Sequence, residues 1–244
     1  MTVGASDVND TSIISLDTSQ MESSAGNEIE VDNLKTNEEN NMLIKAKNNE
    51  SLSGKIDSEI LSVDMSIYSG LSDEIHSGGN IGLQHDYYTY DSGGTIYITV
   101  DNSVIDGKGA VIDMAESTNM RVFFVRASNV TIKNLTIKNS NLNDDGRTIC
   151  FMGSGTVTNC NFTNNTAMNG GAVCFFDIGS VTNCNFTDNE ASSFGGAACF
   201  YYDGTVTNCN FANNNTRDGG AIKIYGTGIV TNCNIVEMRP FRKM

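Results

Sequence analysis

Seven cysteines recur at regular intervals in the second half of the chain, and they are the first residues that could do chemistry. Four lie in copies of the motif GTVTNCNF, and three lie in a second motif, GGAVCFF, and its variants. The two sets are Cys160, Cys184, Cys209 and Cys233, and Cys150, Cys174 and Cys199. Because no C-x-x-C pair occurs and both histidines, His76 and His85, lie outside the repeat, the spacing predicts parallel columns of thiols rather than converging ligands. We therefore expect neither a metal site nor a cofactor.

Acidic residues close to basic ones are the second candidates for chemistry. The first group contains Asp101, Asp106 and Asp113 near Lys108, Arg121 and Arg126, and the second contains Asp144, Asp145 and Arg147. The local sequences DGKG and NDDGR are, however, typical of turns. We predict no catalytic residue and no enzymatic activity.

The elements that must position these residues come from a repeat of 24 or 25 residues. Val157, Val181, Val206 and Val230 open four copies of VTNC, and the paired-glycine motif recurs in step with them. Earlier, more degenerate copies extend the repeat to residues 93–237, as five to six units. A leucine-rich repeat is excluded, since this region has almost no leucine. Short alternating runs broken by Gly and Asn instead predict strands with tight turns.

Units this small cannot bury their own apolar faces, so each must stack on the next. The sequence therefore predicts an all-β fold, a right-handed parallel β-helix of about five to six coils. In the run GGAIKIY, Ile222 and Ile224 share one face and Lys223 lies on the other, so the isoleucine face points inward. By register, Cys150, Cys174 and Cys199 fall on the outer face.

The VTNC cysteines share a face with the phenylalanines two residues later, which predicts an interior column of thiols beside a column of rings. The outer column is spaced closely enough for a disulfide between adjacent coils in an oxidising compartment, and the alternative is free thiols. The asparagines at the bend between Val and Cys should adopt the left-handed conformation and stack as an amide ladder. These are Asn159, Asn183, Asn208 and Asn232. The glycine pairs at 170–171, 195–196 and 219–220 should form another tight corner.

The first third of the chain differs in character from the repeat. Of the formal net charge of −14, residues 1–80 carry −11, from 15 acidic residues and 4 lysines. Their scattered apolar residues show no sustained period, so we expect a disordered, acidic, Asn/Ser-rich leader or spacer over residues 1–80. The β-helix domain then spans 81–237, and 238–244 form an irregular basic tail where the repeat is lost, which suggests a truncated end. The signal peptide is incomplete in this chain.

Taken together, these motifs resemble known families. SVIDGKGAVIDM and RVFFVRASNVTIKNLTIKN look like the opening coils of right-handed β-helix proteins of the pectin-lyase-like group. The F-x-x-N pattern, with GGAV and GGAI, is similar to polymorphic outer-membrane protein repeats. The combination of an acidic, Asn-rich leader with a β-helix body resembles the adhesin-like surface proteins of methanogenic archaea. The resemblance implies a secreted or cell-surface location. Because pectin-lyase-like folds also host polysaccharide lyases and hydrolases, it implies polysaccharide cleavage as the alternative function. Such enzymes need two facing carboxylates, or a calcium-binding acidic group beside a basic residue.

We accordingly expect a non-catalytic, adhesin-like rod that attaches to glycans, cells or surfaces. Nucleic acid is not expected as a partner because basic residues are not clustered. No apolar run approaches the ~18 residues of a membrane helix, and the oligomeric state stays open. Six N-x-S/T sequons lie in the repeat, and glycosylation is expected mainly on loops such as those of Asn164 and Asn214. The sequons begin at Asn129, Asn134, Asn161, Asn164, Asn185 and Asn214.

Overall fold

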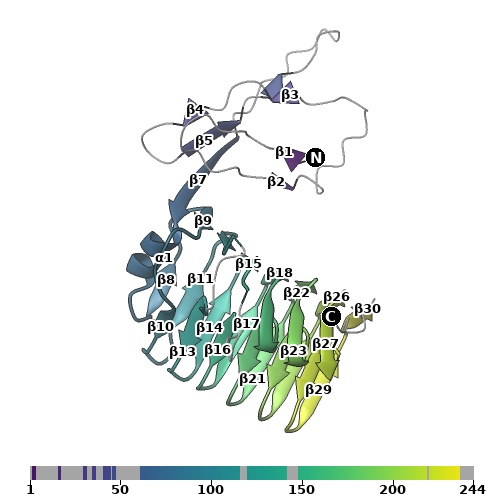
Figure 1. Cartoon of the computed structure of the whole chain (residues 1–244). Coiled ribbons are helices and arrows are strands. Elements are labelled where there is room, and N and C mark those ends of the chain that lie inside the picture. Colours follow the sequence, from purple (N-terminus) through teal and green to yellow (C-terminus); the bar gives the residue numbers. More distant parts are fainter. Residues whose placement is uncertain are drawn as a thin grey trace. The chain divides into compact units, whose positions relative to one another are not determined.

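The computed structural model describes residues 61–115, 120–141, 148–218 and 220–236, together with short strands among residues 1–60. The chain divides into two compact units, Met1–Met65 and Ser66–Met244 (Figure 1). In the first unit, three antiparallel pairs join β1 to β2, β3 to β6 and β4 to β5, and β5 also pairs with β7. The bounds are β1 (Thr2–Val3), β2 (Leu16–Asp17), β3 (Glu30–Val31), β4 (Lys35–Thr36), β5 (Asn41–Ile44), β6 (Ala46–Lys47) and β7 (Leu61–Ile67). The disorder predicted for the leader falls mainly on residues that lie outside the described ones.

The second unit is a parallel β-solenoid with three long walls of stacked strands. Wall 1 contains β8 (Asn80–Gly82), β11 (Val104–Asp106), β14 (Val130–Lys133), β17 (Gly155–Thr158), β21 (Gly179–Thr182), β25 (Gly204–Thr207) and β29 (Gly228–Thr231). Wall 2 contains β9 (Tyr87–Thr89), β12 (Val111–Asp113), β15 (Thr136–Lys138), β18 (Asn161–Thr163), β22 (Asn185–Thr187), β26 (Asn210–Ala212) and β30 (Asn234–Val236). Wall 3 contains β10 (Ile96–Ile98), β13 (Phe123–Val125), β16 (Ile149–Phe151), β20 (Val173–Phe175), β24 (Ala198–Phe200) and β28 (Ile222–Ile224).

A fourth sheet of three strands, the cover sheet, appears only in the later coils. It contains β19 (Thr166–Asn169), β23 (Glu190–Phe194) and β27 (Asn215–Asp218). We number the coils along the chain: coils 1–3 run through walls 1, 2 and 3, and coils 4–6 pass through the cover sheet between walls 2 and 3. Coil 1 is β8–β10, coil 6 is β25–β28, and β29 and β30 begin a seventh. The predicted all-β solenoid of about six coils is therefore confirmed.

Equivalent residues of neighbouring coils lie in register along each wall. Val157 pairs with Val181 and Val181 with Val206 in wall 1, and Phe162, Phe186 and Phe211 follow one another in wall 2. The rings of these three phenylalanines stack at centroid distances of 5.0 and 4.8 Å. A second stack in wall 3 joins the rings of Phe151, Phe175 and Phe200 at 4.6 and 4.9 Å. Residues at equivalent positions of the sequence repeat therefore form continuous columns of identical side chains along the axis of the solenoid.

The folded unit begins earlier than the boundary expected at residue 80. Helix α1 (Tyr68–Ile75) covers the first coil, with Tyr68, Leu71 and Ile75 completely buried (Figure 1). The Tyr68 hydroxyl donates a hydrogen bond to the backbone oxygen of Val122 at 3.1 Å. Residues 66–80 therefore belong with the solenoid, because this short amphipathic helix buries apolar side chains against the end of the stacked strands.

The predicted bends lie at the corners of each coil. The φ angles of Asn159, Asn183, Asn208 and Asn232 are 53°, 54°, 55° and 52°, which is the left-handed region that asparagine tolerates. Gly170 and Gly195 also have positive φ, at 63° and 58°. A Cβ on Gly171 would come within 2.2 Å of the backbone oxygen of Gly196, so this corner requires glycine.

A buried asparagine ladder, not expected from the sequence, runs along the corner after wall 2. Asn165, Asn189 and Asn214 are at most 1% exposed. The Asn189 amide donates to the Phe162 backbone oxygen at 3.0 Å and to Asn214 Oδ1 at 2.9 Å. Its own Oδ1 accepts from the Asn165 backbone N–H at 3.1 Å and from Asn165 Nδ2 at 3.0 Å. Each buried amide thus satisfies backbone groups of its neighbours, which explains the F-x-x-N pattern.

Replacing Asn189 by Ala should destabilise the solenoid strongly, because several buried backbone and amide groups lose their partners at once. An orphaned buried polar group costs about 1–3 kcal/mol, so we expect a loss of roughly 3–5 kcal/mol in the free energy of unfolding. The matched control is Asn185→Ala. The exposed Asn185 amide of wall 2 also donates to an asparagine of the neighbouring coil, Asn161 Oδ1 at 2.8 Å, but its loss should cost about 1 kcal/mol or less because water replaces it. Urea unfolding of both variants measures the difference, and equal losses would contradict the account.

Candidate functional site

The VTNC cysteines form the interior column predicted from the sequence. Cys160, Cys184 and Cys209 are at most 1% exposed, and only Cys233, in the unfinished seventh coil, is partly exposed. The backbone N–H of Cys160 donates to Cys184 Sγ, and that of Cys184 donates to Cys209 Sγ, both at 3.4 Å. The hydrogen bond between Cys160 and Cys184 raises the pKa of Cys184 to about 12 and lowers the pKa of Cys160, and burial raises the pKa of Cys233. Their burial and regular stacking make these cysteines packing residues of the interior.

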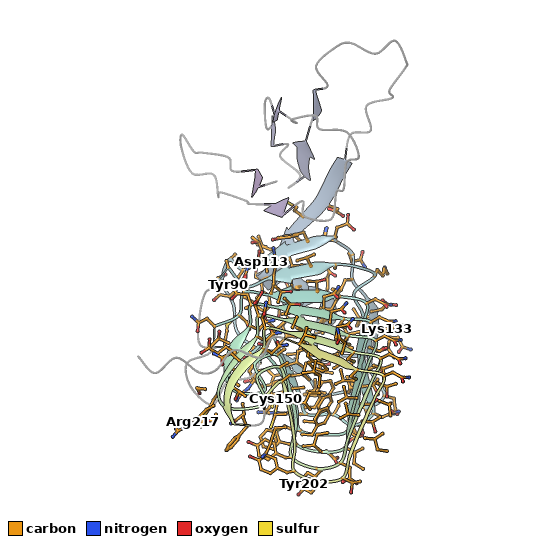
Figure 2. The ribbon with its side chains drawn as sticks, turned by 90° about the vertical axis from the view of Figure 1, so that its right-hand side faces the viewer. Tyr90, Asp113, Lys133, Cys150, Tyr202 and Arg217 are labelled. Carbon is orange, nitrogen blue, oxygen red and sulfur yellow. The ribbon has the colours of Figure 1, made fainter. Side chains whose placement is uncertain are left out.

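The second cysteine column occupies the predicted face of wall 3 but is not at the surface. Cys150 pairs in register with Cys174, Cys174 with Cys199, and Cys199 with Lys223, so the expected outward direction is correct. All three are nevertheless at most 1% exposed, and their sulfurs are thiols rather than disulfides. In Figure 2, Cys150 lies within the cross-section rather than at its outline.

The cover sheet explains this burial, and it reaches coil 3, which has no cover strand of its own, through a parallel bridge between Asn141 and Thr166 of β19. In coils 1 and 2, which lack a cover strand, the same column holds Tyr97, 46% exposed, and the partly exposed Phe124. In the strands of coils 3–5 every wall 3 residue is buried, and Lys223 Nζ of coil 6 lies 5.8 Å from the ring of Phe194 in the cover strand β23. A second layer therefore packs on wall 3, and small apolar cysteines fill the narrow space between the layers.

The carboxylates considered for catalysis do not converge. Asp106 lies in wall 1 and Asp113 in wall 2, and each pairs with a lysine one coil later: Lys133 at 3.2 Å and Lys138 at 3.2 Å. Asp101 accepts a hydrogen bond from the Ser128 backbone N–H at 2.8 Å.

Arg121 and Arg126 instead lie over aromatic rings on wall 3, and Lys108 belongs to the turn after Asp106. Asp144, Asp145 and Arg147 lie outside the described residues. Within the described part of the chain, no three His, Cys, Asp or Glu side chains could share a metal ion.

Asp113 is the most tightly held of these carboxylates. Burial alone would raise its pKa, but hydrogen bonds from Tyr87, the Ala115 backbone and Asn139, with the charge of Lys138, lower it overall. The Tyr87 hydroxyl donates to Asp113 Oδ2 at 2.6 Å, and burial together with this bond raises the pKa of Tyr87 far above its usual value. Both oxygens of the carboxylate are occupied, so this cluster joins neighbouring coils and leaves no free base for catalysis.

The most regular surface of the solenoid is an uncharged lattice, which we call the polar face. It comprises Thr156, Thr158, Asn159, Asn161 and Thr163 of coil 4, Ser180, Thr182, Asn183, Asn185 and Thr187 of coil 5, and Thr205, Thr207, Asn208 and Asn210 of coil 6. The exposed Asn185 amide donates to Asn161 Oδ1 at 2.8 Å, and Asn210 donates to Asn185 Oδ1 at 2.9 Å. Each amide keeps one N–H and one acceptor lone pair for a ligand.

The sequons divide by exposure. Asn129, Asn161, Asn164 and Asn185 are exposed and Asn134 is partly exposed. Asn214 is 1% exposed and its amide donates to the Phe186 backbone oxygen at 2.9 Å. The expectation of a glycan on Asn214 is therefore wrong, since this asparagine belongs to the buried ladder and not to a loop.

The turn from wall 3 to wall 1 carries a row of aromatic and aliphatic side chains that sequence reasoning missed. We call it the aromatic edge, and it consists of Met152, Phe176, Ile178, Tyr201, Tyr202 and Tyr225. The rings of Phe176, Tyr201 and Tyr225 stack at centroid distances of 4.4 and 5.3 Å. In Figure 2, Tyr202 lies at the end of the cross-section opposite Asp113. In coils 3–6 the residue that directly follows the wall 3 strand is Met152, Phe176, Tyr201 and Tyr225 in turn, and this recurrence of large apolar residues in the sequence could have indicated the row.

Comparisons with protein-family models, curated proteins and solved structures found no match. Among the described residues, no helix is long and apolar enough to cross a membrane. The functional argument therefore depends on the surfaces of the solenoid itself.

The burial of both cysteine columns predicts a selective labelling pattern. Under native conditions at mildly alkaline pH, a thiol reagent should modify Cys233 slowly and leave the other cysteines intact, whereas all seven react in urea. Mass spectrometry of the labelled peptides measures this, and Cys233→Ser should abolish the native reaction. Rapid native labelling of Cys174, or a disulfide between Cys150 and Cys174, would contradict the packing of the cover sheet on wall 3.

Proposed function

We propose that this protein is a non-catalytic, adhesin-like binding module of the cell surface or extracellular space, which attaches through its polar face to neutral glycans. The polar face is the single observation that carries this proposal. Its residues present hydroxyl and amide groups and carry no charge, and the exposed carboxylate of Asp188 lies outside it, at the corner after Thr187. Acidic ligands gain nothing from such a surface, whereas the hydroxyl groups of a neutral sugar find both donors and acceptors.

The regular spacing of the polar face favours a polymeric ligand over a single sugar. Strands one coil apart are separated by about 4.8 Å, so each hydroxyl or amide recurs at that interval along the solenoid. The ladder bonds between Asn161, Asn185 and Asn210 hold the amides in place before any ligand binds. Less side-chain entropy is then lost on binding, and several weak contacts can add along an extended chain.

The alternative of polysaccharide cleavage has less support from the described residues. The carboxylates of Asp106 and Asp113 are in different walls, and each is held by a lysine of the following coil. The resemblance to pectin-lyase-like proteins concerns the fold, which hosts many functions, and the site must carry the activity. We therefore place the protein among the binding members of such folds.

Retention on insoluble neutral polysaccharides, compared with acidic ones, tests this proposal. The double variant Thr182→Glu/Asn185→Glu places charge in the centre of the polar face and should weaken binding at least tenfold, because each carboxylate removes a hydrogen-bond donor and holds water that the sugar would have to displace. Thr131→Glu, which lies on wall 1 like Thr182 but in coil 3, is the control and should bind normally. Absence of binding to every neutral polysaccharide, or equal binding by the double variant, would contradict the proposal.

A further inference from the structure

Wall 1 carries a two-dimensional array of short hydroxyl side chains on its outer face over coils 4–6. Each strand there contributes two of them, one on either side of an inward valine that is completely buried. Equivalent members pair in register without a shift, as Thr156 does with Ser180 and Ser180 with Thr205. We call this array the threonine lattice, and its partly exposed members are Thr156, Thr158, Ser180, Thr182, Thr205 and Thr207.

The intervals of the lattice follow from strand geometry. Neighbouring coils are about 4.8 Å apart, and alternate residues of one strand are roughly 6.5–7 Å apart. Lys133, which precedes Thr158 in the same column, lies at the outline of the cross-section in Figure 2, so the column faces outward. Rows of oxygen atoms on the prism faces of hexagonal ice are separated by intervals similar to both. A single extended polymer follows only one row of the lattice, whereas the surface of a crystal meets both intervals at once.

The hydroxyl groups of the lattice are available to water. Thr207 Oγ1 lies 3.3 Å from Thr231 Oγ1 of the seventh coil, and within the described part of the chain the other hydroxyls of the lattice make no hydrogen bond to protein. On wall 2, by contrast, the amide of Asn185 is engaged with Asn161. Because a hydroxyl donates one hydrogen bond and accepts two, each member of the lattice can hold water on its outer side.

The side chains of the lattice are ordered before any contact with a crystal. Threonine is branched at Cβ, which restricts its χ1 rotation, and equivalent residues of successive coils have nearly identical surroundings. The methyl groups between the hydroxyls offer no hydrogen bond, so the water beside them bonds to other water. Little side-chain entropy is therefore lost on adsorption, and many weak contacts add over one rigid surface.

Charged side chains separate the earlier coils of wall 1 from the lattice. In coils 2 and 3, the column that contains Thr158 holds Asp106 and Lys133, whose charged groups are 3.2 Å apart. Ionised groups keep hydration shells of their own, and displacing those shells is costly. The neutral side chains of coils 4–6 impose no such shells, so the water above them can take the arrangement of a crystal.

We propose that the threonine lattice binds ice. Adsorbed protein forces the ice front to advance between the attached molecules as a curved surface, which slows the growth of the crystal. The lattice meets crystalline water alone in this contact, so the inference does not depend on the proposed glycan binding.

Recrystallisation of ice in a frozen sucrose solution, without any added polysaccharide, tests the proposal. The wild type should keep the ice grains small at a concentration at which serum albumin does not. Thr182→Tyr, in the middle coil of the lattice, should require at least about tenfold more protein, because the ring covers neighbouring hydroxyls and displaces the water they hold. Ser192→Tyr places the same ring on the exposed cover strand β23 of the same coil and should match the wild type.

Two further measurements keep the test independent of folding. Urea unfolding of both tyrosine variants should match the wild type, which shows that the lattice and not the core has changed. The wild type alone should also be taken up from solution into a slowly growing ice sphere, and its single ice crystals should be faceted rather than round. Exclusion of the wild type from the ice sphere, or equal inhibition of recrystallisation by Thr182→Tyr and the wild type, would overturn the proposal.

Discussion

In-register stacking of successive coils is the constraint on which the whole solenoid depends. Because parallel strands pair without a shift along walls 1, 2 and 3, every side chain lies against its own equivalent one coil away. Only residues that tolerate this self-contact can be repeated. Phenylalanine stacks its rings, asparagine links its amides, and cysteine fills small spaces, whereas a column of like charges would repel. The four copies of VTNC are the result of that selection, and the thiols within them serve packing.

The same constraint explains how much could be predicted from the sequence. The repeat length and the alternation of apolar residues were enough for the parallel solenoid, the inward faces and the bends at Asn159 and its equivalents. The cover sheet was not predictable in this way. Its strand β19 reads TAMN, in which the two apolar residues are adjacent and show no alternation, so the sequence alone does not distinguish it from a loop. Missing it led to the expectation that Cys150, Cys174 and Cys199 lie at the surface.

The two asparagine ladders show a related limit. Asn164 is exposed with a φ of 55°, and the following Asn165 is completely buried, so the bend itself decides which of two adjacent asparagines turns inward. The alternation of inward and outward side chains along a strand does not continue through such a bend. The sequence analysis therefore placed Asn214 on a loop, although its side chain is buried. The surfaces follow from the same rule: coils 4–6 repeat neutral residues on walls 1 and 2 and aromatic residues at the turn after wall 3. Walls 1 and 2 therefore present hydrogen-bonding groups, and the turn after wall 3 presents aromatic and aliphatic side chains.

Hydrogen exchange of the asparagine side-chain amides, followed by NMR, is the most direct measurement of in-register stacking. The account predicts that the amide protons of Asn165, Asn189 and Asn214, which bond backbone oxygens and the next amide inside the solenoid, exchange far more slowly than those of Asn161, Asn185 and Asn210 on the polar face. Similar, rapid exchange in both sets would contradict the buried ladder and with it the stacked-coil account.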